Sequence, residues 1–95
     1  MATIRIDYQR AVNKSNQIKD LAAEMKKVSA GIDGLIATAN STWQGAAKNS
    51  YVAGCQRLQE KVLASSAAMN SLADKIKYAA DEINRADERS KTYLA

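Results

Sequence analysis

The 95-residue chain contains no proline and no histidine, one cysteine (Cys55), and five aromatic side chains, of which four are Tyr and one is Trp. Because proline breaks helices in their interior, its absence leaves long helices uninterrupted. The absence of histidine excludes a Cys/His zinc site and a Ser–His–Asp triad. A single cysteine cannot close an internal disulfide, so nothing in the sequence requires an oxidising compartment.

The sequence also lacks any apolar run of the about 18–20 residues that a membrane-spanning helix needs, so we expect no membrane insertion. The first ten residues, MATIRIDYQR, have neither the apolar core nor the small-residue cleavage site of a secretory signal. We therefore expect synthesis in the cytoplasm and, if the chain is secreted, export without a cleaved signal peptide. No Gly-rich phosphate loop is present, and we expect no enzymatic activity, metal site or cofactor.

The charge is moderately basic, with 14 Lys and Arg against 10 Asp and Glu and a net charge of +4. A basic coiled-coil protein that binds nucleic acid is the alternative from another functional class. Charges of both signs alternate along the chain, no basic block precedes the heptads, and aromatic side chains are too few for base stacking. We therefore expect a solvated helix surface and no nucleic-acid partner.

Two long segments carry apolar residues at alternating steps of three and four, the spacing of one face of an α-helix. We predict a helix at about residues 8–40, with Asp7 as its N-cap after a short extended arm, a turn at 41–45, and a helix at about 46–90. The first stripe comprises Ile18, Leu21, Met25, Val28, Ile32, Leu35 and Ala39. The second comprises Tyr51, Cys55, Leu58, Val62, Ser65, Met69, Leu72, Ile76, Ala79, Ile83 and Ala86.

A short connection makes the two helices antiparallel neighbours, so we predict an all-α fold: one helical-hairpin domain over residues 1–95. Apolar or small residues beside the stripes predict a partner surface, and two hairpins would then form a four-helix bundle. Gly31 and Gly34 mark either a soft point of the first helix or a close-packing site. The flanking residues are Tyr8, Ala22, Ile36, Val52, Leu63, Ala68, Ala73 and Ala80. Small residues that would allow close helix approach in the bundle are Ser65, Ser66, Ala67, Ala68, Ala79 and Ala80, which are also simply good helix formers. The candidates for the dimer or partner interface are Ile18, Leu21, Met25, Val28, Ile32, Leu58, Val62 and Met69.

The only tryptophan, Trp43, lies at the predicted turn, two residues before Gly45. Trp43 could plug the open end of the bundle by burying its large aromatic surface. It could instead form, with Gly45, a half-exposed cleft that another protein recognises. Gly45 itself allows either a positive φ or the close approach of another backbone. The sequence leaves both pairs of alternatives open.

A Trp-X-Gly motif, here Trp43-Gln44-Gly45, at the middle of a helical hairpin of about one hundred residues resembles the WXG family of small ESAT-like proteins. These are substrates of the type VII (ESX) secretion system, and the resemblance extends over nearly the whole chain, including an aromatic residue at Tyr51. The family implies a second element, Tyr-x-x-x-Asp/Glu, which matches Tyr78 and Glu82. In this sequence that element lies within the predicted second helix rather than after it.

The resemblance implies a non-enzymatic dimeric protein that is exported by the type VII system or acts with it. The implied secretion-machine recognition residues are Trp43, Gly45, Tyr78 and Glu82, and the implied partner there is the secretion ATPase. Since both motifs are on one chain, a homodimer is favoured. A heterodimer with a related small helical protein remains open. So does an adaptor role, in which the chain binds a larger secreted toxin.

Overall fold

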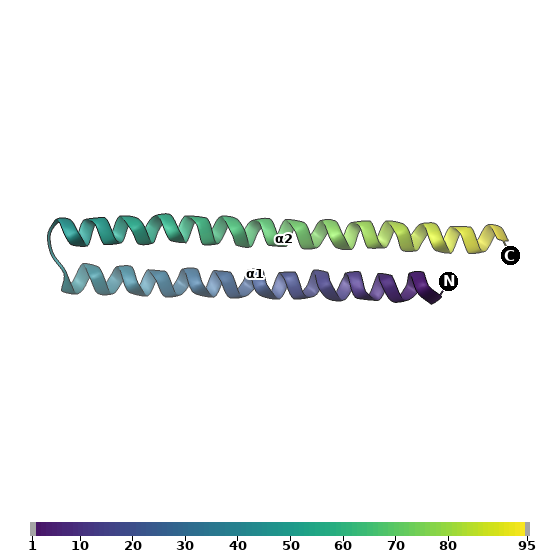
Figure 1. Ribbon diagram of the computed structural model, residues 1–95, viewed down its shortest axis with the longest axis horizontal. Coiled ribbons are helices and arrows are strands. Elements are labelled where there is room, and N and C mark those ends of the chain that lie inside the picture. Colours follow the sequence, from purple (N-terminus) through teal and green to yellow (C-terminus); the bar gives the residue numbers. More distant parts are fainter. Residues whose placement is uncertain (1, 95) are drawn as a thin grey trace. The chain divides into compact units, whose positions relative to one another are not determined.

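The computed structural model of the protein describes the main chain of residues 2–94 and the side chains of residues 7–90. Helix α1 spans Ala2–Thr42 and helix α2 spans Ala46–Leu94, and no strand occurs in the described range (Figure 1). Three residues, Trp43 to Gly45, connect the two helices. The predicted all-α helix–turn–helix fold is therefore confirmed.

Both helices extend beyond their predicted outer ends. The predicted start near residue 8 is wrong, because α1 begins at Ala2, and Asp7 is an exposed residue inside the helix rather than its N-cap. The extended arm expected at residues 3–6 is likewise helical. No proline or glycine precedes Gly31, and a helix satisfies its own backbone groups whereas a lone extended arm has no strand to pair with. The helix α2 continues to Leu94, four residues past its predicted end.

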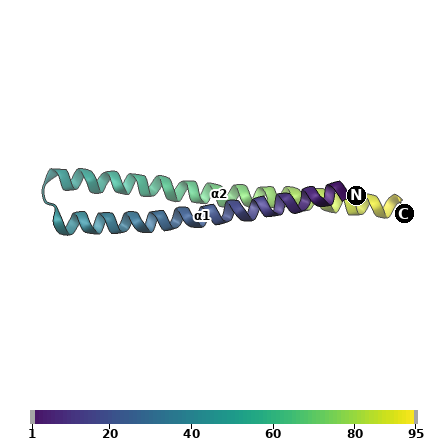
Figure 2. The same cartoon turned by 60° about the horizontal axis from the view of Figure 1, so that its bottom comes forward.

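The two helices pack as two compact units. Unit 2, residues Leu21–Ala68, contains the second half of α1, the turn and the first half of α2. Within it the helices run in opposite directions away from the turn, as Figure 2 shows from a second angle. Unit 1 pairs the first part of α1, up to Asp20, with the part of α2 that begins at Met69. Each unit is thus an antiparallel helix pair.

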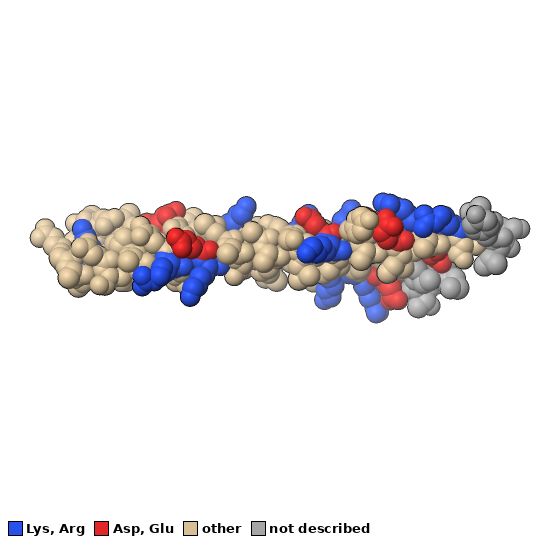
Figure 3. Space-filling model, turned by 90° about the horizontal axis from the view of Figure 1, so that it is seen from above, with Lys and Arg blue, Asp and Glu red and all other residues tan. Residues whose placement is uncertain are grey.

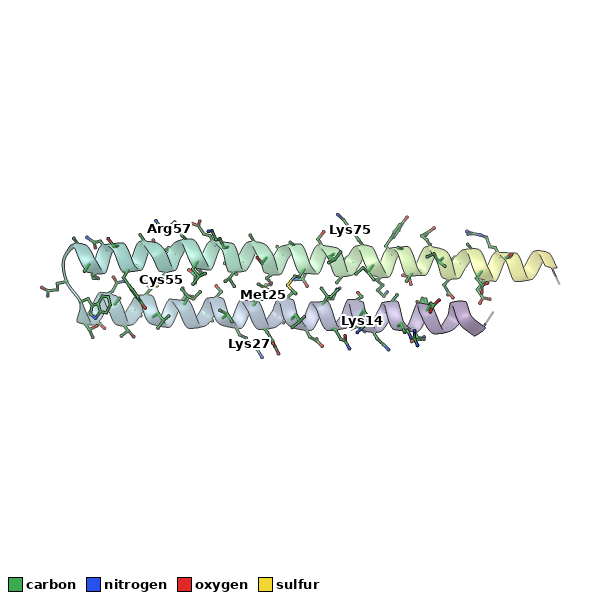
Figure 4. All side chains as sticks on the ribbon, in the orientation of Figure 1. Lys14, Met25, Lys27, Cys55, Arg57 and Lys75 are labelled. Atoms are coloured by element: carbon green, nitrogen blue, oxygen red, sulfur yellow. The ribbon has the colours of Figure 1, made fainter. Side chains whose placement is uncertain are left out.

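Small side chains fill most of the space between the helices of unit 2. Ala22 and Ser66 are fully buried, and Ser29, Ile32 and Ala39 are nearly so. Among these five residues only Ile32 has a large apolar side chain. Figure 4 shows Met25 and Cys55 between the two helices, whereas Lys27 and Arg57 project away from the opposing helix. Cys55 is only partly buried.

The interior of unit 1 is built in the same way. Ser15 and Ala73 are fully buried, and Ala80 is 7% exposed. The Ser15 hydroxyl donates a hydrogen bond of 2.8 Å to the main-chain carbonyl oxygen of Ala73 on the other helix. Among the described residues no buried side-chain nitrogen or oxygen lacks a hydrogen-bond partner. The polar residues between the helices are therefore satisfied within the chain, as buried polar groups generally are.

The predicted stripes were only half right about which residues face inward. Leu21 and Val28 are 50% and 55% exposed, while the next residues along the chain, Ala22 and Ser29, are buried. The predicted flanking residues Ala22, Ala73 and Ala80 belong to the interior. Ser66, considered either as a site of close helix approach in the bundle or simply as a good helix former, is also buried within the single chain. Residues spaced by three and four can be chosen on either of two adjacent faces of the same helix. In the structure, the face with the smaller side chains packs against the other helix.

Gly31 and Gly34 lie inside the uninterrupted helix α1 and are both exposed. A Cβ atom built on either glycine would meet nothing within 4 Å. The proposed close-packing site at these glycines is therefore not present within the chain. Glycine in an exposed helix costs about 1 kcal/mol relative to alanine, so the pair weakens α1 locally without breaking it.

Candidate functional site

Gly45 gives the turn its shape. Its φ is +87°, the only positive φ in the described part of the chain. Its carbonyl oxygen accepts a hydrogen bond of 3.2 Å from the amide of Asn49, which starts the hydrogen-bonding pattern of α2. A Cβ at Gly45 would meet nothing within 4 Å, so the conformation and not crowding requires glycine. Of the two predicted roles for Gly45, the positive φ is confirmed and the close backbone approach within the chain is wrong.

Trp43 extends the last turn of α1, since its amide donates a hydrogen bond of 2.9 Å to the carbonyl oxygen of Ala39. Its ring packs against Tyr51 of α2, with ring centroids 4.9 Å apart and ring planes inclined by 55°. This tilted arrangement is a favourable one for aromatic pairs. Trp43 nevertheless remains 47% exposed. One side of the ring therefore packs across the turn while the remainder faces solvent.

A shallow hollow of about 70 Å³ lies beside this aromatic pair. It is bordered by Leu35, Thr38 and Ala39 of α1 together with Trp43 and Tyr51. Leu35 is 51% exposed, so the edge of the hollow presents aliphatic as well as aromatic surface. We refer to these five residues as the turn site. The sequence stripes include Leu35 and Tyr51, but only the structure brings both beside Trp43.

The surroundings of the turn site carry almost no charge. From Gly34 to Gln56 the chain has one charged residue, Lys48. Figure 3 shows this as a nearly continuous tan surface at the end that bears the turn. Burial raises the pKa of the Tyr51 phenol above its usual value of 10.0, and its hydrogen bond with Cys55 raises that pKa further. Tyr51 is therefore neutral at physiological pH, and the turn site is an apolar surface with one phenol.

Tyr78 and Glu82, the other two predicted recognition residues, lie on α2 in unit 1. Tyr78 is 67% exposed. The carboxylate of Glu82 accepts a hydrogen bond of 2.8 Å from Nη1 of Arg85, three residues later on the same helix. The phenol is thus open to solvent, while the carboxylate already has an exposed ionic partner.

Sequence reasoning missed a polar cluster between the helices of unit 1. The Tyr8 hydroxyl donates a hydrogen bond of 2.8 Å to Oδ1 of Asp81, and the other carboxylate oxygen, Oδ2, lies 3.7 Å from Nζ of Lys77. This hydrogen bond raises the pKa of Tyr8, and partial burial raises it further. Lys19 and Asp74 form a second contact between the helices at 2.8 Å. The i,i+4 spacing of Lys77 and Asp81 was visible in the sequence, but the contact with Tyr8, 73 residues away, was not.

The residues predicted to form a dimer or partner interface fall into three groups in the single chain. Ile32 is buried between the helices of unit 2. Leu21, Val28 and Leu58 are half exposed. The remaining four are intermediate in exposure: Ile18, Met25, Val62 and Met69.

The model of the family described as proteins of 100 residues with WXG matches residues 3–88 of the chain. The protein belongs to the WXG100 family. The Trp-X-Gly element that names the family is Trp43-Gln44-Gly45, the connection between α1 and α2. No curated protein and no solved structure matches the chain.

Two further observations concern the chemistry that this WXG100 chain carries. Across its described residues, neither helix is apolar over a sufficient length to span a bilayer. In the same range, no three His, Cys, Asp or Glu residues are grouped so that they could hold a metal ion.

Proposed function

We propose that this WXG100 protein is a non-enzymatic component of type VII (ESX) secretion, exported as a dimer without a cleaved signal peptide. Membership of the family supports the assignment to this system. The observation that carries the proposal is the half-exposed Trp43, held by Tyr51 beside the positive-φ Gly45. In this role the turn site is the surface that the secretion ATPase recognises.

The physical argument for recognition rests on pre-organisation. A large aromatic side chain that is already held in place loses little entropy on binding, and Trp and Tyr are enriched among residues that dominate binding energy. Trp43 is fixed from two directions, by its helical hydrogen bond to Ala39 and by its contact with Tyr51. The absence of nearby charge other than Lys48 keeps the desolvation cost of the turn site low.

Tyr78 and Glu82 provide a second recognition surface in this proposal. They are four residues apart on α2, so they lie on neighbouring positions of the same helix face. Glu82 contacts Arg85, and exposed ion pairs of this kind typically contribute only about 0–1 kcal/mol. A basic group on the export machinery could therefore replace Arg85 at little cost.

Dimerisation is supported by a series of exposed apolar residues in unit 2, which we call the outer apolar row. Leu35 of α1 and Tyr51 of α2 border the same hollow. The other members of the row follow these two residues along their helices, away from the turn, at steps of seven, so they lie on the same side of the helix pair. Each member is at least 37% exposed in the single chain. Contiguous apolar surface of this kind usually marks an interaction site. The row consists of Leu21, Val28 and Leu35 on α1 and of Tyr51 and Leu58 on α2.

An export assay tests the proposal directly. A host with an active type VII system would express the chain with Trp43→Ala, and the amounts in culture medium and in cells would be compared by immunoblot. Gln44→Ala is the matched control, because it changes the neighbouring exposed residue of the same turn. We expect loss of export for Trp43→Ala and normal export for Gln44→Ala. Normal export of a folded Trp43→Ala protein would contradict recognition through the turn site.

Tyr78→Ala and Glu82→Gln extend the same assay to unit 1, with Glu60→Gln as the control for losing one carboxylate from α2.

If the chain instead acts as an adaptor for a larger toxin, light scattering would give a monomer when the chain is purified alone. Co-purification would then recover the toxin. A mass of twice the 10.3 kDa of the chain would support the homodimer.

A further inference from the structure

Three side chains connect α1 and α2 by donating hydrogen bonds to main-chain carbonyl oxygens of the opposing helix. Ser15 donates to Ala73 at 2.8 Å, Ser66 to Ala22 at 2.8 Å, and Gln59 to Ser29 at 3.0 Å. The donors alternate between the helices: Ser15 is on α1, while Ser66 and Gln59 are on α2. Both serines are 0% exposed.

All three bonds belong to a single register. The numbers of the paired residues, 15 with 73, 22 with 66 and 29 with 59, add up to 88 in every case. Half of 88 is 44, the number of the middle residue of the Trp43-Gln44-Gly45 turn. The turn and the hydrogen bonds therefore specify the same pairing of the helices. This agreement holds separately in unit 1, through Ser15, and in unit 2, through Ser66 and Gln59.

The bonds also require the helices to lie close together. Each buried serine donates to a carbonyl inside a helix, and such a carbonyl also accepts the amide hydrogen bond of its own helix. A serine hydroxyl extends only one atom past Cβ, so it reaches this oxygen only where the facing residue is small. The facing residue is alanine in both cases, Ala73 for Ser15 and Ala22 for Ser66.

We infer that Ser15, Ser66 and Gln59 set the spacing and register of the two helices and thereby hold the outer apolar row outside. The consequence for that row is geometric. With alanine and serine in the narrow space between the helices, Leu21 and Val28, which directly precede Ala22 and Ser29, face outward. Ser66 is thus a positioning residue for the surface that we assign to a partner. The inference concerns the fold and holds whether or not the chain is exported.

Two substitutions at Ser66 distinguish the contribution of its hydrogen bond from the contribution of its small side-chain volume. Ser66→Ala keeps the spacing and removes the donor, while Ser66→Val adds volume as well. The neighbouring Ser65 is exposed, so Ser65→Ala and Ser65→Val are matched controls. In urea unfolding of the full chain at one concentration, we expect Ser66→Ala to raise the unfolding equilibrium constant about 2- to 12-fold. We expect Ser66→Val, which also overpacks the space between the helices, to raise it by about 5-fold or more relative to Ser66→Ala.

A cross-linking measurement reports register independently of stability. The same pairing places position 55, the native Cys55, level with position 33, and a slip of one helix by a heptad would place it level with position 26 or 40. Lys26→Cys, Asp33→Cys and Asn40→Cys would each be treated with a short bis-maleimide, and intrachain products would be identified by mass spectrometry. Asp33→Cys removes the second hydrogen bond of Gln59, 2.7 Å to Oδ1 of Asp33, but leaves the acceptor that defines the register, the main-chain oxygen of Ser29. We expect the highest yield for Asp33→Cys, and a lower preference for that position when Ser66→Val is added.

Two results would overturn the inference. One is that Ser66→Ala and Ser66→Val unfold like the corresponding Ser65 variants. The other is that the three cysteine positions cross-link to Cys55 with equal yield in the chain that retains Ser66. If the Ser66→Val protein does not fold, the comparison of Ser66→Ala with Ser65→Ala and the cross-linking of the unaltered Ser66 chain still decide the matter.

Discussion

The rings of Trp43 and Tyr51 are in contact across the helix–helix turn, with centroids 4.9 Å apart. Trp43 directly follows α1 and Tyr51 lies on α2, so the contact ties the end of α1 to the beginning of α2. Trp43 is at the same time 47% exposed. A structural contribution and a recognition role can therefore be separated by experiment, because they depend on different parts of one side chain.

Removing the aromatic partner should weaken the turn while leaving Trp43 in the chain. We expect Tyr51→Leu to lower the free energy of unfolding by about 0.5–1.5 kcal/mol, the typical contribution of an aromatic pair beyond its buried area. Trp43 fluorescence should also shift to longer wavelength in the folded protein, since the ring becomes more exposed. Urea unfolding and emission spectra would measure both effects. An unchanged emission spectrum would mean that Tyr51 does not shield Trp43 in solution.

Gly45 and Gly34 should respond oppositely to alanine. At Gly45, where φ is +87°, an L-residue is strained, and we expect Gly45→Ala to lower the free energy of unfolding by about 1–2 kcal/mol. At Gly34, which is helical, exposed and unobstructed, we expect Gly34→Ala to raise it by up to about 1 kcal/mol. Thermal unfolding of the two variants side by side would test the pair. Equal effects would argue against the assigned turn conformation.

A charge in the outer apolar row should prevent dimerisation without unfolding the helices. We expect Leu58→Glu to reduce the mass measured by light scattering from twice 10.3 kDa to that of one chain, because a carboxylate would be desolvated in the interface. Helical content measured by circular dichroism should be largely retained. Gln56→Glu, which makes the same change in charge at another exposed position of α2, should leave the mass unchanged.

Tyr8 should make stability depend on pH in the alkaline range. Its pKa is raised in the folded chain, chiefly by the hydrogen bond to Asp81, so the folded state favours the neutral phenol. This contribution is fully present below the usual pKa of 10.0 and is lost as the pH rises through the raised value. We expect Tyr8→Phe to be less stable than the unaltered chain at neutral pH, with a difference that shrinks at strongly alkaline pH. Urea midpoints across this range would measure it, with Tyr78→Phe, at an exposed tyrosine, as the control.

The sequence was a reliable guide to the helices and the turn, and a poor one to the faces of the helices. Missing proline, repeated apolar steps and the Trp43–Gly45 motif were enough to predict α1, α2 and the connection. They could not show that Ala22 and not Leu21 faces inward, because hydropathy patterns weight large side chains and the interior is made of small ones. The contact between Tyr8 and Asp81 depends on register, which no single helix pattern contains.

The pairing of residues about position 44 also limits how this chain can change in length. Inserting one residue between the turn and Ser66 would rotate the rest of α2 by about 100°, and would direct Leu72 into the space that accepts Ala73. Inserting seven residues into one helix alone would keep the same side chains facing the other helix. It would, however, displace each buried serine by one heptad from the alanine whose carbonyl oxygen it contacts. Only matched additions of a heptad on both sides of the turn preserve the hydrogen bonds together with the outer apolar row. Insertions and deletions are therefore tolerated only when both helices gain or lose the same number of heptads, on either side of Gln44.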